Sequence, residues 1–246
     1  MKSILLDTCI IDYLINEGSE SELKFLKDKK VFFSIGTLIE LGTGFNKKLS
    51  KIDKFINDFN VNILRNLLPI LDKELNQYPL ELDIIDYIGP KSDRTLQELQ
   101  IHGHFQTKIR EFNSSRLPLK RNIEDIKNYF HIEKINFEDK NEYRHHIKES
   151  IRQKITKQNF RLRKVPFNTI FRAFVIEKFV IQSNKIEPQD FNDLLICLCS
   201  IYFDYFVVEN KNYNVLQSII NERGLKDIFK HNLKIMNLKE FKLTCG

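Results

Sequence analysis

Short apolar runs alternate with amphipathic stretches towards both ends of the chain. Residues 3–6 (SILL), 31–34 (VFFS) and 205–208 (YFVV) are apolar, partly β-branched or aromatic, and short enough to be buried strands. Residues 233–241 (LKIMNLKEF) predict a last strand. Strands that alternate with helices favour an α/β fold with a parallel sheet.

Helical periodicity fills the spaces between these strands. The pattern predicts helices within residues 8–18, 19–29, 49–75, 188–203 and 212–220. Gly18 is placed to close the first helix, and the serines and glutamate that open the second suit an N-terminal cap. Pro69 is expected to kink or end a helix.

The middle of the chain has a different pattern. Residues 59–185 contain few glycines, several amphipathic segments of helix length and no comparable alternation of strands, and residues 86–93 (DYIGPKSD) predict a turn or loop. We therefore expect three segments: the first half of the core at 1–58, a large, mainly helical basic insertion at 59–185, and the second half of the core at 186–246.

Composition narrows the class of protein. A chain of 246 residues with 42% hydrophobic content can bury a real core. The N-terminus does not resemble a signal peptide and no apolar run approaches the roughly 18 residues of a membrane span, so we expect a cytoplasmic protein without a membrane partner. The four cysteines form no metal or disulfide pattern, and Cys197 and Cys199 are expected to pack in the core.

Positive charge is concentrated in the middle segment. The formal net charge is +6, and residues 59–185 carry 23 Lys/Arg against 16 Asp/Glu. Within 144–172 the only acid is Glu149, and isoleucines recur at every fourth position, which suits a helix with a basic outer face. Such a face is either simply solvated or binds a polyphosphate. The candidate nucleic-acid contacts are Arg144, Lys148, Arg152, Lys157, Arg161, Arg163 and Lys164.

Acidic residues follow the predicted strands. Asp7 comes directly after residues 3–6, Glu209 after 205–208, Glu40 six residues beyond 31–34, and Asp193 in the opening turns of the helix before 205–208. The carboxyl ends of parallel strands share one edge of a sheet, where ligand sites collect. Clustered carboxylates repel one another unless a cation holds them, and oxygen ligands suit Mg²⁺ or Mn²⁺ and phosphodiester hydrolysis.

Each acid also has a structural explanation. Asp7 is suited to cap the helix that begins at Thr8, and Asp190 to cap the later helix with Asp193 at the capping-box position. Glu40 taken alone would be a surface residue of a helix. The histidines at 102, 104, 145 and 146 lack the spacing of a zinc site.

Taken together, the three blocks ILLDTCIIDYLI, VFFSIGTLIELGTG and DFNDLLICLCSIYFDYFVVENKNYNVL resemble the signature blocks of PIN-domain nucleases. The resemblance covers about residues 1–45 and 188–246. It implies a PIN-like parallel sheet flanked by helices, with Asp7, Glu40 and Asp193 as metal ligands and Glu209 as the fourth, while Asp190 competes with Asp193 for the third position. Two features depart from the family: glutamate stands where aspartate is commoner, and the second and third acids are far apart in sequence.

The resulting hypothesis is an endonuclease that depends on Mg²⁺ or Mn²⁺ and acts on RNA in preference to DNA. The resemblance adds a role as a toxin or defence nuclease, with an antitoxin or inhibitor protein as partner, and a homo-oligomer is a further expectation. One alternative is a catalytically inactive PIN-like scaffold that binds nucleic acid or protein, and another is a DNA-directed nuclease of mobile-element defence.

Overall fold

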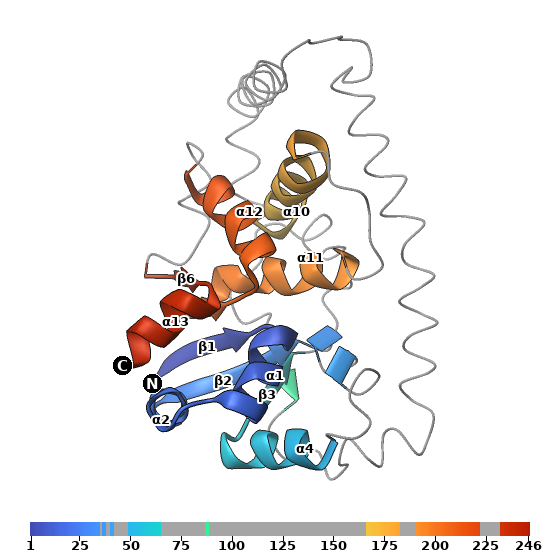
Figure 1. Cartoon of the computed structure of the whole chain (residues 1–246). Coiled ribbons are helices and arrows are strands. Elements are labelled where there is room, and N and C mark those ends of the chain that lie inside the picture. Colours follow the sequence, from blue (N-terminus) through green and yellow to red (C-terminus); the bar gives the residue numbers. More distant parts are fainter. Residues whose placement is uncertain are drawn as a thin grey trace, which may run out of the picture.

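The computed structural model describes residues 1–34, 36–37, 40–41, 49–64, 87–88, 166–182, 190–221 and 232–246. Its centre is a six-stranded sheet in the order β4-β3-β2-β1-β5-β6 (Figure 1). The strands are β1 (Lys2–Leu6), β2 (Lys29–Ser34), β3 (Asn62–Leu64), β4 (Tyr87–Ile88), β5 (Tyr205–Val207) and β6 (Lys234–Met236). All neighbours pair in parallel except β3 and β4, so the predicted α/β fold with a parallel sheet is confirmed.

Helices cover both faces of this sheet (Figure 1). On one face lie α1 (Thr8–Glu17), α2 (Glu20–Lys27), α4 (Leu49–Asp58) and α13 (Leu238–Cys245). On the other face lie α10 (Pro166–Val175), the π-helix η4 (Ile176–Ile181), α11 (Asp190–Cys199), the short η5 (Ser200–Tyr202) and α12 (Asn210–Asn221). No helix of the described residues is long and apolar enough to cross a membrane.

The position of β1 in the middle of the sheet explains why its sequence at residues 4–6 is continuously apolar. Side chains of a strand alternate between its faces, so Ile4 and Leu6 belong to the hydrophobic cluster that includes α1 and α2, while Leu5 belongs to the cluster that includes α10 and α11. All three have no exposed surface. Strands of a parallel sheet covered on both faces are expected to be continuously hydrophobic.

Several predicted elements are confirmed with small shifts in their bounds. Helix α1 ends where Gly18 donates its N–H to the carbonyl oxygen of Leu14 (3.3 Å). The Ser19 side chain caps α2 and forms a capping box with Glu22. Cys197 and Cys199 lie in the core, as expected.

Three expectations from the pattern are wrong. The helix predicted over 49–75 stops at Asp58, because Asn60 takes a left-handed conformation (φ 46°) and turns the chain into β3. Residues 87 and 88, predicted as loop, pair with β3 as the antiparallel edge strand. The last predicted strand is short, since Asn237 caps a helix, α13, directly after β6.

The segment 59–185 is described only in part. Within it, β3 and β4 extend the sheet, while α10 and η4 pack into the core with Ile170 and Phe174 fully buried. The remainder of the predicted helical insertion lies outside the described residues.

The close approach at Gly18 leads to a test of the turn after α1. A Cβ atom at this position would lie 2.5 Å from the carbonyl oxygen of Leu14. Gly18→Ala is therefore expected to lower the free energy of unfolding by about 1–3 kcal/mol, measured by urea denaturation. The neighbouring exposed Glu17→Ala is the control and should leave it nearly unchanged; equal stability of both variants would mean that the turn shifts without cost.

Candidate functional site

The carboxyl ends of β2, β1 and β5 lie side by side, and the acidic residues predicted from the sequence follow them. Asp7 comes directly after β1, and its N–H donates to the carbonyl oxygen of Val207 at the end of β5 (3.0 Å). Glu209 follows β5 by two residues. At the end of β2, the Ser34 hydroxyl accepts the N–H of Thr37 (2.9 Å), and both Thr37 and Glu40 have helical backbone.

Asp7 is both a helix cap and a member of this group. Its Oδ1 accepts the N–H of Thr8 (2.7 Å) at the start of α1, and its Oδ2 accepts the N–H of Glu209 (3.3 Å). Only 6% of its surface is exposed. The capping role considered from the sequence is therefore confirmed, and it orients the carboxylate rather than removing it from the site.

Glu40 is tied to the same place by Thr8. The Thr8 hydroxyl donates a hydrogen bond to Oε2 of Glu40, and this bond links the residues that follow β1 to those that follow β2. Both side chains are half-buried. Glu40 is therefore not a fully exposed glutamate on a helix surface, which was its structural explanation from the sequence.

Electrostatics show that four acids share this location. Burial, the charge of Asp193 and the charge of Glu40 raise the pKa of Asp7 to about 7, against two lowering backbone hydrogen bonds. Burial and the same two charges also raise the pKa of Glu209, which Lys178 and Lys211 partly offset. Asp7, Glu40, Asp193 and Glu209 are therefore close enough for their charges to interact, as the sequence predicted.

A buried lysine that the sequence analysis did not select completes the group. Lys178 of η4 has no exposed surface, and its ammonium contacts Oδ1 of Asp190 (2.7 Å), Oδ2 of Asp193 (3.1 Å) and Oδ1 of Asn212 (3.1 Å). Burial by itself would lower the pKa of Lys178, but the charges of Asp193 and Asp190 and their hydrogen bonds outweigh it and raise that pKa. The ammonium therefore stays charged.

The sequence carried a signal for this residue. Lys178 stands in the apolar run AFVIEKFVI at 173–181, where an unpaired charge would be costly. Asp190 is fully buried beside it, and Lys211 lies 3.8 Å from the same oxygen. The hydrophobic pattern assigns this segment to the insertion at 59–185, far in sequence from the acids of the core.

The predicted nucleic-acid contacts cannot be placed relative to these acids. Arg144, Lys148, Arg152, Lys157, Arg161, Arg163 and Lys164, the candidate nucleic-acid contacts, are outside the described residues. In the part of the chain that is described, no three His, Cys, Asp or Glu side chains lie close enough to form a complete metal site. The four acids are therefore near enough to interact electrostatically, but they form only a loose group, too far apart to ligate one ion together.

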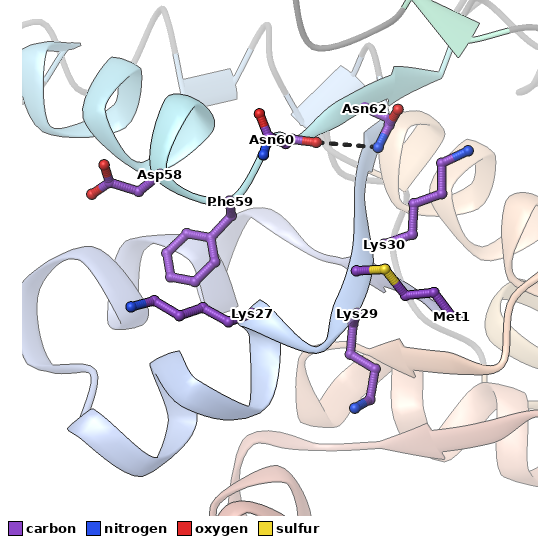
Figure 2. Close-up of a pocket in the computed structure, with 8 residues that line it drawn as sticks. All are labelled: Met1, Lys27, Lys29, Lys30, Asp58, Phe59, Asn60 and Asn62. Carbon is purple, nitrogen blue, oxygen red and sulfur yellow. Dashed lines mark hydrogen bonds between the residues drawn. The ribbon is translucent and has the colours of Figure 1, made fainter.

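A pocket of about 370 Å³ lies at the other edge of the sheet, where β2 and β3 begin. Three lysines line it, but Figure 2 shows Lys27, Lys29 and Lys30 extending in different directions. The ammonium of Lys29 lies over the ring of Phe25 (4.3 Å), and that of Lys30 lies over the ring of Phe32 (5.2 Å). Because the lysines do not converge, we do not assign this pocket an anion.

Comparison with known proteins gives no match: no protein-family model, no curated protein and no solved structure is detectably similar to this chain.

The raised pKa of Asp7 predicts a pH-dependent stability difference between wild type and Asp7→Asn. The folded pKa is about 7 against 3.8 for an unperturbed aspartate, so the folded protein loses stability as pH rises from about 4 to 7 and the loss is complete above that. Asparagine keeps the capping oxygen and carries no charge. The free energy of unfolding of Asp7→Asn, relative to that of wild type, should therefore rise by on the order of 3 kcal/mol between pH 4 and pH 8.

Urea denaturation at a series of pH values, with a chelator present, measures this difference. Glu17→Gln, which removes one exposed negative charge near the end of the same helix, is the matched control. A difference between Asp7→Asn and wild type that stays constant with pH would contradict the crowding of carboxylates around Asp7.

Proposed function

We propose that this protein is a PIN-like endonuclease that hydrolyses phosphodiester bonds with the help of Mg²⁺ or Mn²⁺. The observation that carries the proposal is the group of four acids at the carboxyl edge of the sheet, in which burial and neighbouring charges raise the pKa of Asp7 to about 7. Repulsion between like charges at a partly buried site is costly, and a divalent cation would relieve that cost.

The donor set fits such an ion. Asp7, Glu40, Asp193 and Glu209 offer carboxylate oxygens, which suit Mg²⁺ and Mn²⁺ rather than softer metals. When bound, a divalent cation would lower the pKa of a water molecule and neutralise charge on the phosphate. The described acids are not close enough to one another to hold an ion as they stand. We therefore expect their side chains to move closer together when the ion binds.

The chain's own residues orient this set. Two backbone N–H groups hold Asp7, the Thr8 hydroxyl holds Glu40, and Lys178 holds Asp193. Such partners restrict the rotation of ligand side chains, and their loss weakens metal binding or activity. A site that positions a metal ion and a water molecule requires oriented ligands on rigid elements, and carboxylates at the ends of sheet strands meet this requirement.

RNA is the proposed substrate in preference to DNA, and the basic residues between 144 and 164 are its proposed contacts. Their positive charge would attract the phosphate backbone, which the acids alone would repel. A role as a toxin or defence nuclease, controlled by an inhibitor protein, belongs to the same proposal and rests on the resemblance of the sequence blocks.

A second candidate is a catalytically inactive scaffold that binds nucleic acid or protein. One observation favours it: the ammonium of Lys178 already balances Asp190 and Asp193, two of the acids that a metal site would use. A scaffold would bind RNA without cleaving it and without needing a divalent cation.

Cleavage of labelled single-stranded RNA and DNA in Mg²⁺ or Mn²⁺ tests the proposal. Wild type should cleave RNA, while Asp7→Asn and Glu40→Gln should each reduce the rate by about 100-fold or more, because each removes a ligand charge worth several kcal/mol in the transition state. Asp28→Asn, at an exposed acid before β2, is the control and should cleave normally.

Cleavage that continues with a chelator, or that Asp7→Asn leaves intact, would refute the proposed mechanism. RNA binding by a folded wild type without cleavage of either substrate would favour the scaffold.

A further inference from the structure

Lys178 has no exposed surface, and its ammonium is enclosed by two hydrogen-bond acceptors and one ion-pair partner. An ammonium group has three N–H donors, and three oxygen atoms of Asp190, Asp193 and Asn212 surround it within 3.1 Å. The rings of Phe174 and Phe179 lie 5.3 Å and 5.8 Å from the same nitrogen. Lys178 therefore cannot bind a substrate phosphate directly, and any role must act through the acids it holds.

Stability alone is a weak explanation for this arrangement. Taking a lysine and two aspartates out of water is costly, and well-packed apolar side chains at such positions often stabilise a protein as well or better. The lysine also stands in a π-helix, a rare distortion that is frequent at functional sites. The η4 segment brings its charge to the start of α11, beside the proposed metal ligands.

The contacts divide the acids of α11 into two kinds. Asp190 is fully buried and has one oxygen on Lys178 and near Lys211, so its charge is balanced inside the protein. Asp193 is 9% exposed and gives only Oδ2 to Lys178, which leaves Oδ1 for another ligand. One cation is thus already present on the α11 side of the acid group.

We propose that Lys178 is a built-in cation that takes the place of a second divalent ion, so that this site holds one Mg²⁺ or Mn²⁺ per chain. Lys178 acts as a positioning residue: it fixes Asp193 so that its remaining oxygen joins Asp7, Glu40 and Glu209, and it withdraws Asp190 from metal binding. This inference rests on the proposed function, and it specifies how many ions that function uses.

The test is a count of bound Mn²⁺ by electron paramagnetic resonance of free Mn²⁺, using the full chain. Wild type should bind one ion per chain. Lys178→Met, which has a similar length and no charge, should bind two, because the oxygens of Asp190 and Asp193 that contacted the ammonium can then contact a second ion. Lys178→Met combined with Asp190→Asn should return to one, because the second ion loses a ligand charge.

The possible results separate the two proposals. Two ions in wild type, or one ion in folded Lys178→Met, would overturn the role of Lys178 and leave the metal-dependent nuclease standing. No bound ion in wild type would overturn both. A lysine that acts only in packing would leave the count the same in all three proteins.

Lys178→Met is liable to unfold because it removes the buried ammonium that contacts both Asp190 and Asp193. Circular dichroism with and without Mn²⁺ covers this case, since the inference requires Mn²⁺ to restore folding of Lys178→Met by replacing the ammonium. Failure of Mn²⁺ to do so, while the double variant folds without it, would overturn the inference.

Discussion

Burial of β1 on both faces is the constraint on which the rest of the structure depends. Its side chains alternate between two hydrophobic clusters, so β1 can only be the central strand, between β2 and β5. This position makes the chain return after roughly 200 residues to pair Ile4 with Tyr205. Asp7, the first polar residue after the strand, is thereby held at the sheet edge against Val207 and Glu209.

The edge that β1 defines concentrates negative charge. Three neighbouring parallel strands end there. Asp7, Glu40 and Glu209 follow these strands, and Asp193 lies in the first turn of α11. Partial burial strengthens their repulsion, because the local dielectric is lower than that of water. Two backbone N–H groups on Asp7, a hydroxyl on Glu40 and an ammonium on Asp193 offset part of that repulsion and fix the side chains.

The other edge of the sheet has a different character. Strands β1, β2 and β6 begin with Lys2, Lys29 and Lys234, and in the β1–β2 register Lys2 lies opposite Lys29. Asp204 holds the start of β1 there by accepting the N–H and hydroxyl of Ser3 (2.8 and 2.9 Å). Acids therefore collect where the strands end, and lysines are the first residues of three of the strands.

Much of this was readable from the sequence. Continuous apolar runs, Gly18 and the Ser19 capping box determined the strands and helices near the N-terminus, because their causes are local. The positions of Asp7, Glu40, Asp193 and Glu209 followed from the rule that parallel strands end at a common edge. Only the tertiary structure decided that Lys178 joins them, because its partners are 12 to 34 residues away and a buried ion pair leaves no periodic pattern. The turn at Asn60 and the helix after Asn237 likewise depended on backbone conformations that hydrophobic periodicity does not record.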